Sequence, residues 1–206
     1  MCTDVFIKTV INIICSNEGN YGSVNKDDNL LLNTSSLSIG ALQWHGSRAK
    51  KLLNLIVSKN EDQAREILSA TTIFSDLNRD DDFWDQRTAN SLEAEKLSRL
   101  LITPEGIQTQ DELLEKDINS YIIHGINLGI TNMQVLAYFA DLENQGGPYI
   151  AEGITQAAGK ASKITLTEIH EAALLDPVLG PNKPRRNITY TRIINALPAS
   201  LNINQK

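Results

Sequence analysis

The sequence contains few of the side chains that hold metals or form disulfides. Two cysteines, Cys2 and Cys15, and three histidines occur among its 206 residues. The histidines stand far apart, at positions 45, 124 and 170, and neither C-x-x-C nor H-E-x-x-H spacing occurs. Paired cysteines or closely spaced ligands are what disulfide frameworks and metal sites require. We therefore expect no disulfide, no metal site and no cofactor.

An excess of positive charge and a long apolar run are also missing. Lysine and arginine number 19 against 25 aspartates and glutamates, which gives a formal net charge of −6. A protein that binds nucleic acid usually presents a basic face, and a membrane span needs a longer apolar stretch. The apolar N-terminal segment lacks a basic start and a small-residue cleavage site. We expect a monomer that is made in the cytoplasm without a signal peptide, acts after release, and neither binds nucleic acid nor inserts into a membrane.

Helical periodicity is abundant. Apolar residues recur at helical spacing over 4–17, and an apolar helix over 132–143 is followed by the Gly146-Gly147-Pro148 stop. Helix starts are indicated by Ser47, by Thr103-Pro104, and by the capping pairs Asn60/Gln63, Asn90/Glu93 and Thr165/Glu168. The alternation of apolar and polar residues that is typical of β-strands is nearly absent. A short hairpin could form within 23–42, in a region that otherwise has the composition of a loop. The sequence predicts one mainly α-helical domain over residues 1–206, which could divide into two lobes.

The stretch CSNEGNYGSVNKDDN, residues 15–29, breaks this pattern. Glu18 ends an apolar helix and precedes a glycine-rich loop, so its carboxyl could lie between a packed core and an open groove. That setting disfavours a charged carboxylate and keeps a proton available for general acid catalysis. Gly19 and Gly22 would let the backbone approach a bulky substrate, and Tyr21 would supply a flat face or a hydroxyl. The alternative is a solvated glutamate at a helix C-terminus, where the helix dipole is unfavourable for an anion.

A second motif follows in residues 38–43, Ser-Ile-Gly-Ala-Leu-Gln. Together, EGNYGSVNKDDN and SIGALQWHG resemble the lysozyme-like superfamily, in particular goose-type lysozymes, soluble lytic transglycosylases and a cell-wall hydrolase domain of Firmicutes and their phages. The resemblance covers about residues 13–57. It implies a mainly α, two-lobed lysozyme-like fold with at most a short β-hairpin, and it makes Glu18 the general acid. The sequence departs from the pattern in an insert, LLLNTSS, at 30–36, and in Ala41-Leu42, where the motif has Leu-Met.

The resemblance also implies which residues bind the sugar chain. Ser38, Gly40 and Gln43 would shape the floor of a groove and hydrogen-bond an N-acetyl sugar. Trp44 or Tyr21 would offer an apolar surface to a sugar ring.

Outside the motif, Asn144 and Gln145 end the apolar helix. They would form either a plain polar helix end or contacts to a sugar or stem peptide on the opposite wall of the groove. Arg185 and Arg186 begin the last predicted helix, at the end that is unfavourable for cations. They would pair with a buried carboxylate or bind a substrate anion.

A second carboxylate could come from Asp28 or, as second choice, from Asp27, ten and nine residues after Glu18. An inverting glycosidase needs a base about 6.5–9.5 Å from the acid, and a retaining one needs a nucleophile about 5–5.5 Å away. The same Asn-Lys-Asp-Asp-Asn segment is also typical of a turn whose side chains bond to their own backbone. A lytic transglycosylase would need neither aspartate, because the 6-hydroxyl of the substrate displaces the bond while Glu18 acts as acid and then base.

The resemblance therefore implies a peptidoglycan glycosidase that cleaves the β-1,4 bond between N-acetylmuramic acid and N-acetylglucosamine, as a phage endolysin does. One alternative is a chitosanase-type glycosidase on the same fold, because a polycationic substrate agrees with the net charge of −6. The other alternative is a non-catalytic sugar-binding or structural virion protein.

Overall fold

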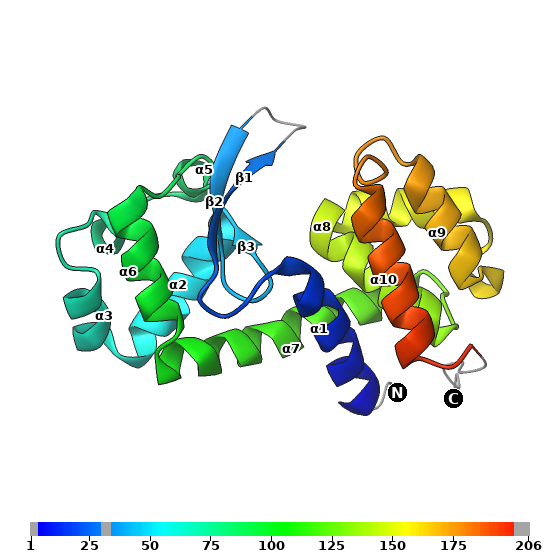
Figure 1. Ribbon diagram of the computed structural model, residues 1–206, viewed down its shortest axis with the longest axis horizontal. Helices are drawn as coiled ribbons and strands as arrows, with labels where there is room; N and C mark the ends of the chain where they lie inside the picture. Colours follow the sequence, from blue (N-terminus) through cyan, green and yellow to red (C-terminus); the bar gives the residue numbers. More distant parts are fainter. Residues whose placement is uncertain (1–3, 30–33, 200–206) are drawn as a thin grey trace. The chain divides into compact units, whose positions relative to one another are not determined.

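The computed structural model describes residues 4–29 and 34–199, and among these the side chains of 26–29, 34 and 35 lie outside the description. In this part of the chain the elements are α1 (Asp4–Glu18), β1 (Val24–Asn29), β2 (Thr34–Ile39), β3 (Trp44–His45), α2 (Ser47–Lys59), α3 (Glu61–Ile67), α4 (Ile73–Asp76), α5 (Asp81–Trp84), α6 (Ser91–Leu101), α7 (Pro104–Asn127), α8 (Met133–Ala158), the 3₁₀ helix η1 (Ala161–Lys163), α9 (Leu166–Leu175) and α10 (Lys183–Ala196). The predicted mainly α-helical fold is confirmed (Figure 1). None of the helices so described is both long and apolar enough to cross a membrane.

The strands form one small antiparallel sheet in the order β1-β2-β3. β1 and β2 pair from Val24 opposite Ile39 to Asn29 opposite Thr34. The predicted hairpin within 23–42 is therefore confirmed, and it replaces much of the expected loop. β3 is a two-residue strand that the sequence did not predict, and it pairs Ser38 with His45.

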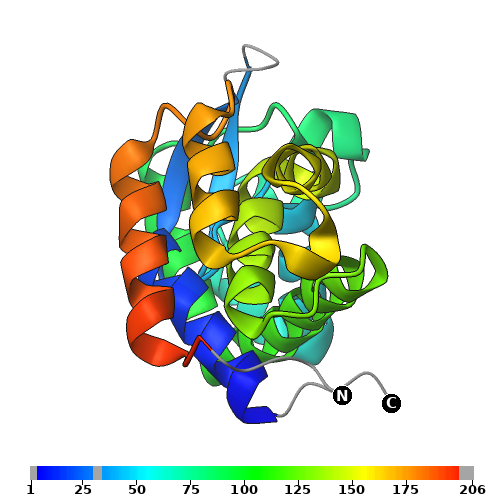
Figure 2. The same cartoon turned by 90° about the vertical axis from the view of Figure 1, so that its right-hand side faces the viewer.

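The chain divides into two compact units, one of residues 1–17 with 115–206 and the other of residues 18–114. In the first unit, α9 and α10 pack against α8 and against each other (Figure 2). The core of this unit is the apolar helix predicted at 132–143, whose residues from Val135 to Ala140 are fully buried. The second unit holds the sheet with α2 to α6, around a core that includes Leu37, Trp44 and Trp84.

Helix α8 is interrupted where the sequence predicts a stop. Gly147 has φ 77° and ψ 174°, a backbone conformation that glycine adopts without a steric penalty. Pro148 follows it in the first turn of the second segment, where a missing N–H costs no helical hydrogen bond. The helix then continues to Ala158 in a new direction.

The predicted helix starts are largely confirmed. The capping boxes Asn90/Glu93 and Thr165/Glu168 are both present. The prediction that Ser47 caps α2 is wrong, because Gly46 occupies the cap position and the Ser47 N–H donates to Asp85 Oδ1 at 2.7 Å.

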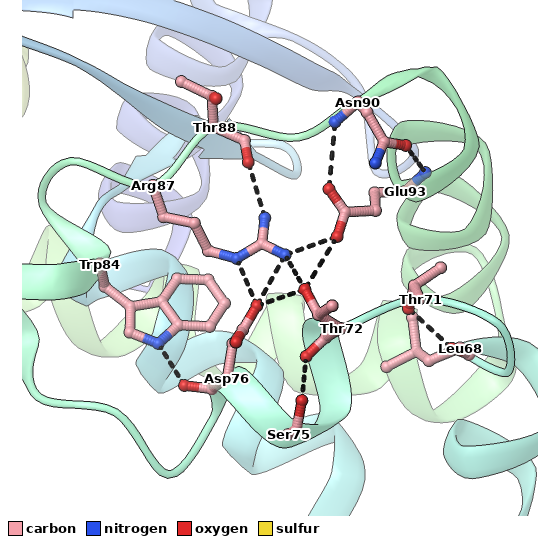
Figure 3. Close-up of polar contacts among 10 residues, drawn as sticks. All are labelled: Leu68, Thr71, Thr72, Ser75, Asp76, Trp84, Arg87, Thr88, Asn90 and Glu93. Atoms are coloured by element: carbon pink, nitrogen blue, oxygen red, sulfur yellow. Dashed lines mark hydrogen bonds and ion pairs between the residues drawn. The ribbon is translucent and has the colours of Figure 1, made fainter.

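A buried ion cluster fixes the segment between α4 and α6 (Figure 3). Arg87 donates to Asp76 Oδ2 at 3.0 Å and to Glu93 Oε1 at 2.7 Å. Burial opposes charge on Glu93, yet the hydrogen bonds from Arg87 and from the Asn90 amide hold the pKa of Glu93 below its ordinary value. The carbonyl of Arg87 accepts from the Leu37 N–H at 2.7 Å. The cluster thereby anchors strand β2, which leads into the Ser-Ile-Gly motif.

Candidate functional site

Glu18 is the last residue of α1, and its side chain is half-buried. The loop that follows is held by local hydrogen bonds. Asn20 Oδ1 accepts from the Gly22 N–H at 2.9 Å, and Ser23 Oγ accepts from the Asn20 N–H at 2.9 Å. These contacts give the chain after the acid a defined path into β1.

The Ser-Ile-Gly-Ala-Leu-Gln motif forms a tight turn beside this loop. Gly40 and Gln43 both have positive φ, 75° and 51°. The Gly40 N–H donates to the Ser23 carbonyl at 2.8 Å, and Gln43 Nε2 donates to the Gly40 carbonyl at 2.9 Å. Gln43 Oε1 accepts from Asn25 Nδ2 at 2.7 Å. The two motifs that the sequence analysis connected are therefore in direct contact.

Gln110 of α7 holds the turn by a hydrogen bond to its backbone. The sequence analysis did not identify this residue. Its side chain is fully buried, and its Oε1 accepts from the Ala41 N–H at 3.0 Å. Its Nε2 donates to the Leu101 carbonyl at 2.9 Å. The only signal in the sequence is a glutamine within an otherwise helical pattern, which does not reveal a partner 69 residues away.

Tyr21 lies at the same site and is half-exposed. Its hydroxyl donates to Asp111 Oδ1 at 2.5 Å, so α7 also fixes the position of this ring. Asp111 is a second residue that sequence reasoning missed. A ring fixed at its hydroxyl and open to solvent on part of its surface agrees with the expected sugar contact, which remains a prediction.

Trp44 and Ser38 require a correction. Both are 0 % exposed, so neither presents its side chain to solvent. The Trp44 ring packs against the turn, where a Cβ added to Gly40 would lie 3.0 Å from it. The expectation that Trp44 offers a sugar-stacking face is replaced by a role in the core, since β3 turns this side chain inward. Gly40 is buried too and shapes the turn through its backbone.

Asp27 and Asp28 lie on β1, where their backbones pair with Ser36 and Ser35. The segment is a strand, not the turn considered as an alternative. The side chains of both aspartates lie outside the described residues. Their assignment as the second carboxylate remains a prediction.

Asn144 and Gln145 lie in the other unit, at the end of the first segment of α8. Gln145 Oε1 accepts from Arg186, and its Nε2 donates to Asp141 Oδ2 at 3.4 Å. Asp141 is fully buried, and Arg185 and Arg186 each approach it to 3.2 Å. The hypothesis that these arginines pair with a buried carboxylate is confirmed, and Gln145 belongs to the same polar cluster.

Among the side chains that the structure describes, no group of three or more from His, Cys, Asp or Glu is arranged to hold a metal ion.

No protein-family model matches the chain, and no curated protein matches its sequence. Among solved structures, the chain is similar to native chitosanase from Bacillus subtilis MY002, with a TM-score of 0.63 and 15 % identity over 93 % of this chain and 86 % of that one. The chain has the fold of a chitosanase. A glutamate-to-alanine mutant of the same chitosanase, in complex with 6 GlcN, matches with a TM-score of 0.61 over the same shares of the two chains. The predicted lysozyme-like, mainly α fold is thus confirmed.

Proposed function

We propose that this protein is a glycoside hydrolase that cleaves β-1,4-linked glucosamine chains, with Glu18 as general acid. The observation that carries the proposal is the chitosanase fold, which covers 93 % of the chain and has Glu18 at the end of its first helix. The chitosanase solved with 6 GlcN carries its alanine substitution at a glutamate close to its own N-terminus, as Glu18 is here. A half-buried carboxyl at such a position can protonate the leaving glycosidic oxygen.

The other groups around Glu18 support the same chemistry. Tyr21 and the Gly40–Gln43 turn donate hydrogen bonds to Asp111 and Gln110 of α7, so they form a preorganised surface for a sugar ring. Asp28, or Asp27, on strand β1 would activate water or stabilise the developing positive charge. The net charge of −6 attracts a polycationic polymer, whose amino groups are protonated at mildly acidic pH.

Peptidoglycan remains a second candidate substrate because one specific observation favours it. The two motifs that resemble wall hydrolases, around Glu18 and at 38–43, are joined by the Gly40-to-Ser23 hydrogen bond. A muramidase would use Glu18 in the same way. The anionic character of this chain fits chitosan better, since bacterial walls carry anionic polymers.

The deciding experiment compares two substrates. We expect reducing ends to be released from chitosan and little loss of turbidity from Gram-positive cell walls. Glu18→Gln keeps the shape of the side chain and removes its acid, so it should lower the rate by about 10²–10⁴-fold while the circular dichroism spectrum stays unchanged. Lysis of cell walls without cleavage of chitosan would identify peptidoglycan as the substrate. Full activity of the Glu18→Gln variant would overturn the assignment of Glu18 as general acid.

A further inference from the structure

Gln43 is held in a backbone conformation that few residues other than glycine adopt. Its φ of 51° lies in the left-handed region. Such a conformation persists only where the surrounding contacts fix it, and it is concentrated at binding and catalytic sites. The side chain of Gln43 is fixed at both ends, because Nε2 donates to the Gly40 carbonyl at 2.9 Å and Oε1 accepts from Asn25 Nδ2 at 2.7 Å. The amide of Gln43 is therefore engaged within the protein itself.

This amide lies against the residue that follows the candidate acid. A Cβ added to Gly19 would lie 3.2 Å from Gln43 Nε2, so the two residues are in van der Waals contact. Glu18, Gly19, Asn25 and Gln43 all belong to the unit of residues 18–114. One compact unit thus holds both the acid and the amide pair of Asn25 and Gln43.

The same hydrogen bonds determine which atom of Asn25 is left for a ligand. Because Gln43 uses Nε2 as donor to a carbonyl, the atom that it turns toward Asn25 is an acceptor, and Asn25 must offer its N–H to it. The oxygen Oδ1 of Asn25 then lies on the other branch of its amide. Asn25 is exposed, and among the side chains that the structure describes Gln43 is its one partner. Asn25 consequently presents a hydrogen-bond acceptor whose orientation is fixed.

We infer that Asn25 is a specificity-determining residue of the Glu18 site, where its Oδ1 accepts a hydrogen bond from the 2-ammonium group of a glucosamine unit. Gln43 is then a positioning residue, and the side-chain contact to sugar that the resemblance implies for Gln43 is made by Asn25. An ammonium group offers three charged donors to such an acceptor, whereas an N-acetyl group offers one neutral N–H and adds bulk. The inference rests on the proposed function and names the residue that distinguishes glucosamine from its N-acetyl form.

The test measures binding of a glucosamine hexamer by calorimetry in the Glu18→Gln background, in which the sugar persists. Adding Asn25→Ala should weaken binding about tenfold, the loss expected for one hydrogen bond to a charged donor. Gln43→Gly removes the orienting amide and suits the positive φ, so the turn keeps its backbone. It should weaken binding by about three- to tenfold. The double variant should bind no more weakly than Asn25→Ala alone, because Gln43 acts through Asn25.

A kinetic measurement separates this role from a structural one. In the enzyme with Glu18 intact, Asn25→Ala should raise KM for chitosan more than it lowers kcat. The increase in KM should shrink as the chitosan is more heavily N-acetylated, since fewer units then carry an ammonium group. Asn78→Ala, at an exposed position in the same unit, is the matched control and should match its parent in both measurements.

Two results would overturn the inference and leave the proposed function intact. One is an Asn25→Ala variant that binds the hexamer like its parent, and the other is an increase in KM that does not depend on the degree of acetylation. Additive losses in the double variant would contradict the positioning role of Gln43. If the wild-type protein neither binds the hexamer nor cleaves chitosan, the proposed function fails and the role of Asn25 fails with it.

Discussion

At the scale of single residues, Gly40 is constrained both by its backbone conformation and by the side chains packed against it. Its φ of 75° lies in the left-handed region, and an added Cβ would lie 2.5 Å from Gln110 Oε1. That oxygen accepts from the Ala41 N–H, so it has little freedom to move away. The glycine in Ser-Ile-Gly is required here by geometry, independently of any resemblance.

Replacing Gly40 with alanine should therefore destabilise the protein by about 1–3 kcal/mol, the usual cost of strained backbone. The measurement is urea unfolding followed by circular dichroism. Gly153→Ala is the matched control, because this glycine is at an exposed position of helix α8 with open space around it. It should raise the stability by about 0.5–1 kcal/mol. Equal stability of the two variants would contradict the account given for Gly40.

At the scale of secondary-structure elements, several helices begin where a cap side chain accepts a hydrogen bond from a free backbone N–H group, namely α3, α5, α6, α8, α9 and α10. The capping box at α6 is connected to the fold beyond the helix. Glu93 accepts from the Asn90 N–H at 3.1 Å and from Arg87 at 2.7 Å. The carboxylate of Glu93 consequently stabilises both the start of α6 and Arg87, whose carbonyl accepts a hydrogen bond from Leu37 of strand β2.

Asn90→Ala removes the acceptor for the Glu93 N–H and should lower the free energy of unfolding by about 1 kcal/mol. Thermal and urea unfolding would measure the change. Asn78→Ala, at an exposed position in the same unit, should change stability by less than about 0.5 kcal/mol. An Asn90 variant as stable as the Asn78 variant would show that the cap contributes nothing.

At the scale of the whole molecule, the net charge of −6 is a long-range property of the surface. It favours encounter with a polycation without specifying any contact. Exposed charges are screened over about 10 Å at 0.1 M salt.

KM for chitosan should accordingly rise with ionic strength while kcat changes little. Steady-state kinetics between low and high salt would measure this, with an uncharged, fully N-acetylated oligosaccharide as comparison for binding. A KM for chitosan that is independent of salt would remove the electrostatic part of the proposal.

The sequence by itself determined the local features. The end of α1 at Glu18, the break at Gly147 and the capping boxes follow from residue types that are adjacent in the chain, and short-range sterics and hydrogen bonds decide them. Glu18 could be singled out for the same reason, because its setting at a helix end before glycines is local.

Only the tertiary structure decided which side chains meet. Trp44 is buried and not open to a sugar, because a two-residue strand pairs with β2 and turns the ring inward. Gln110 reaches Ala41 across 69 residues, and His124 links two segments of α8. Neither contact leaves a periodic pattern in the sequence. Burial and long-range hydrogen bonding depend on how the elements pack, and local propensities carry no information about that.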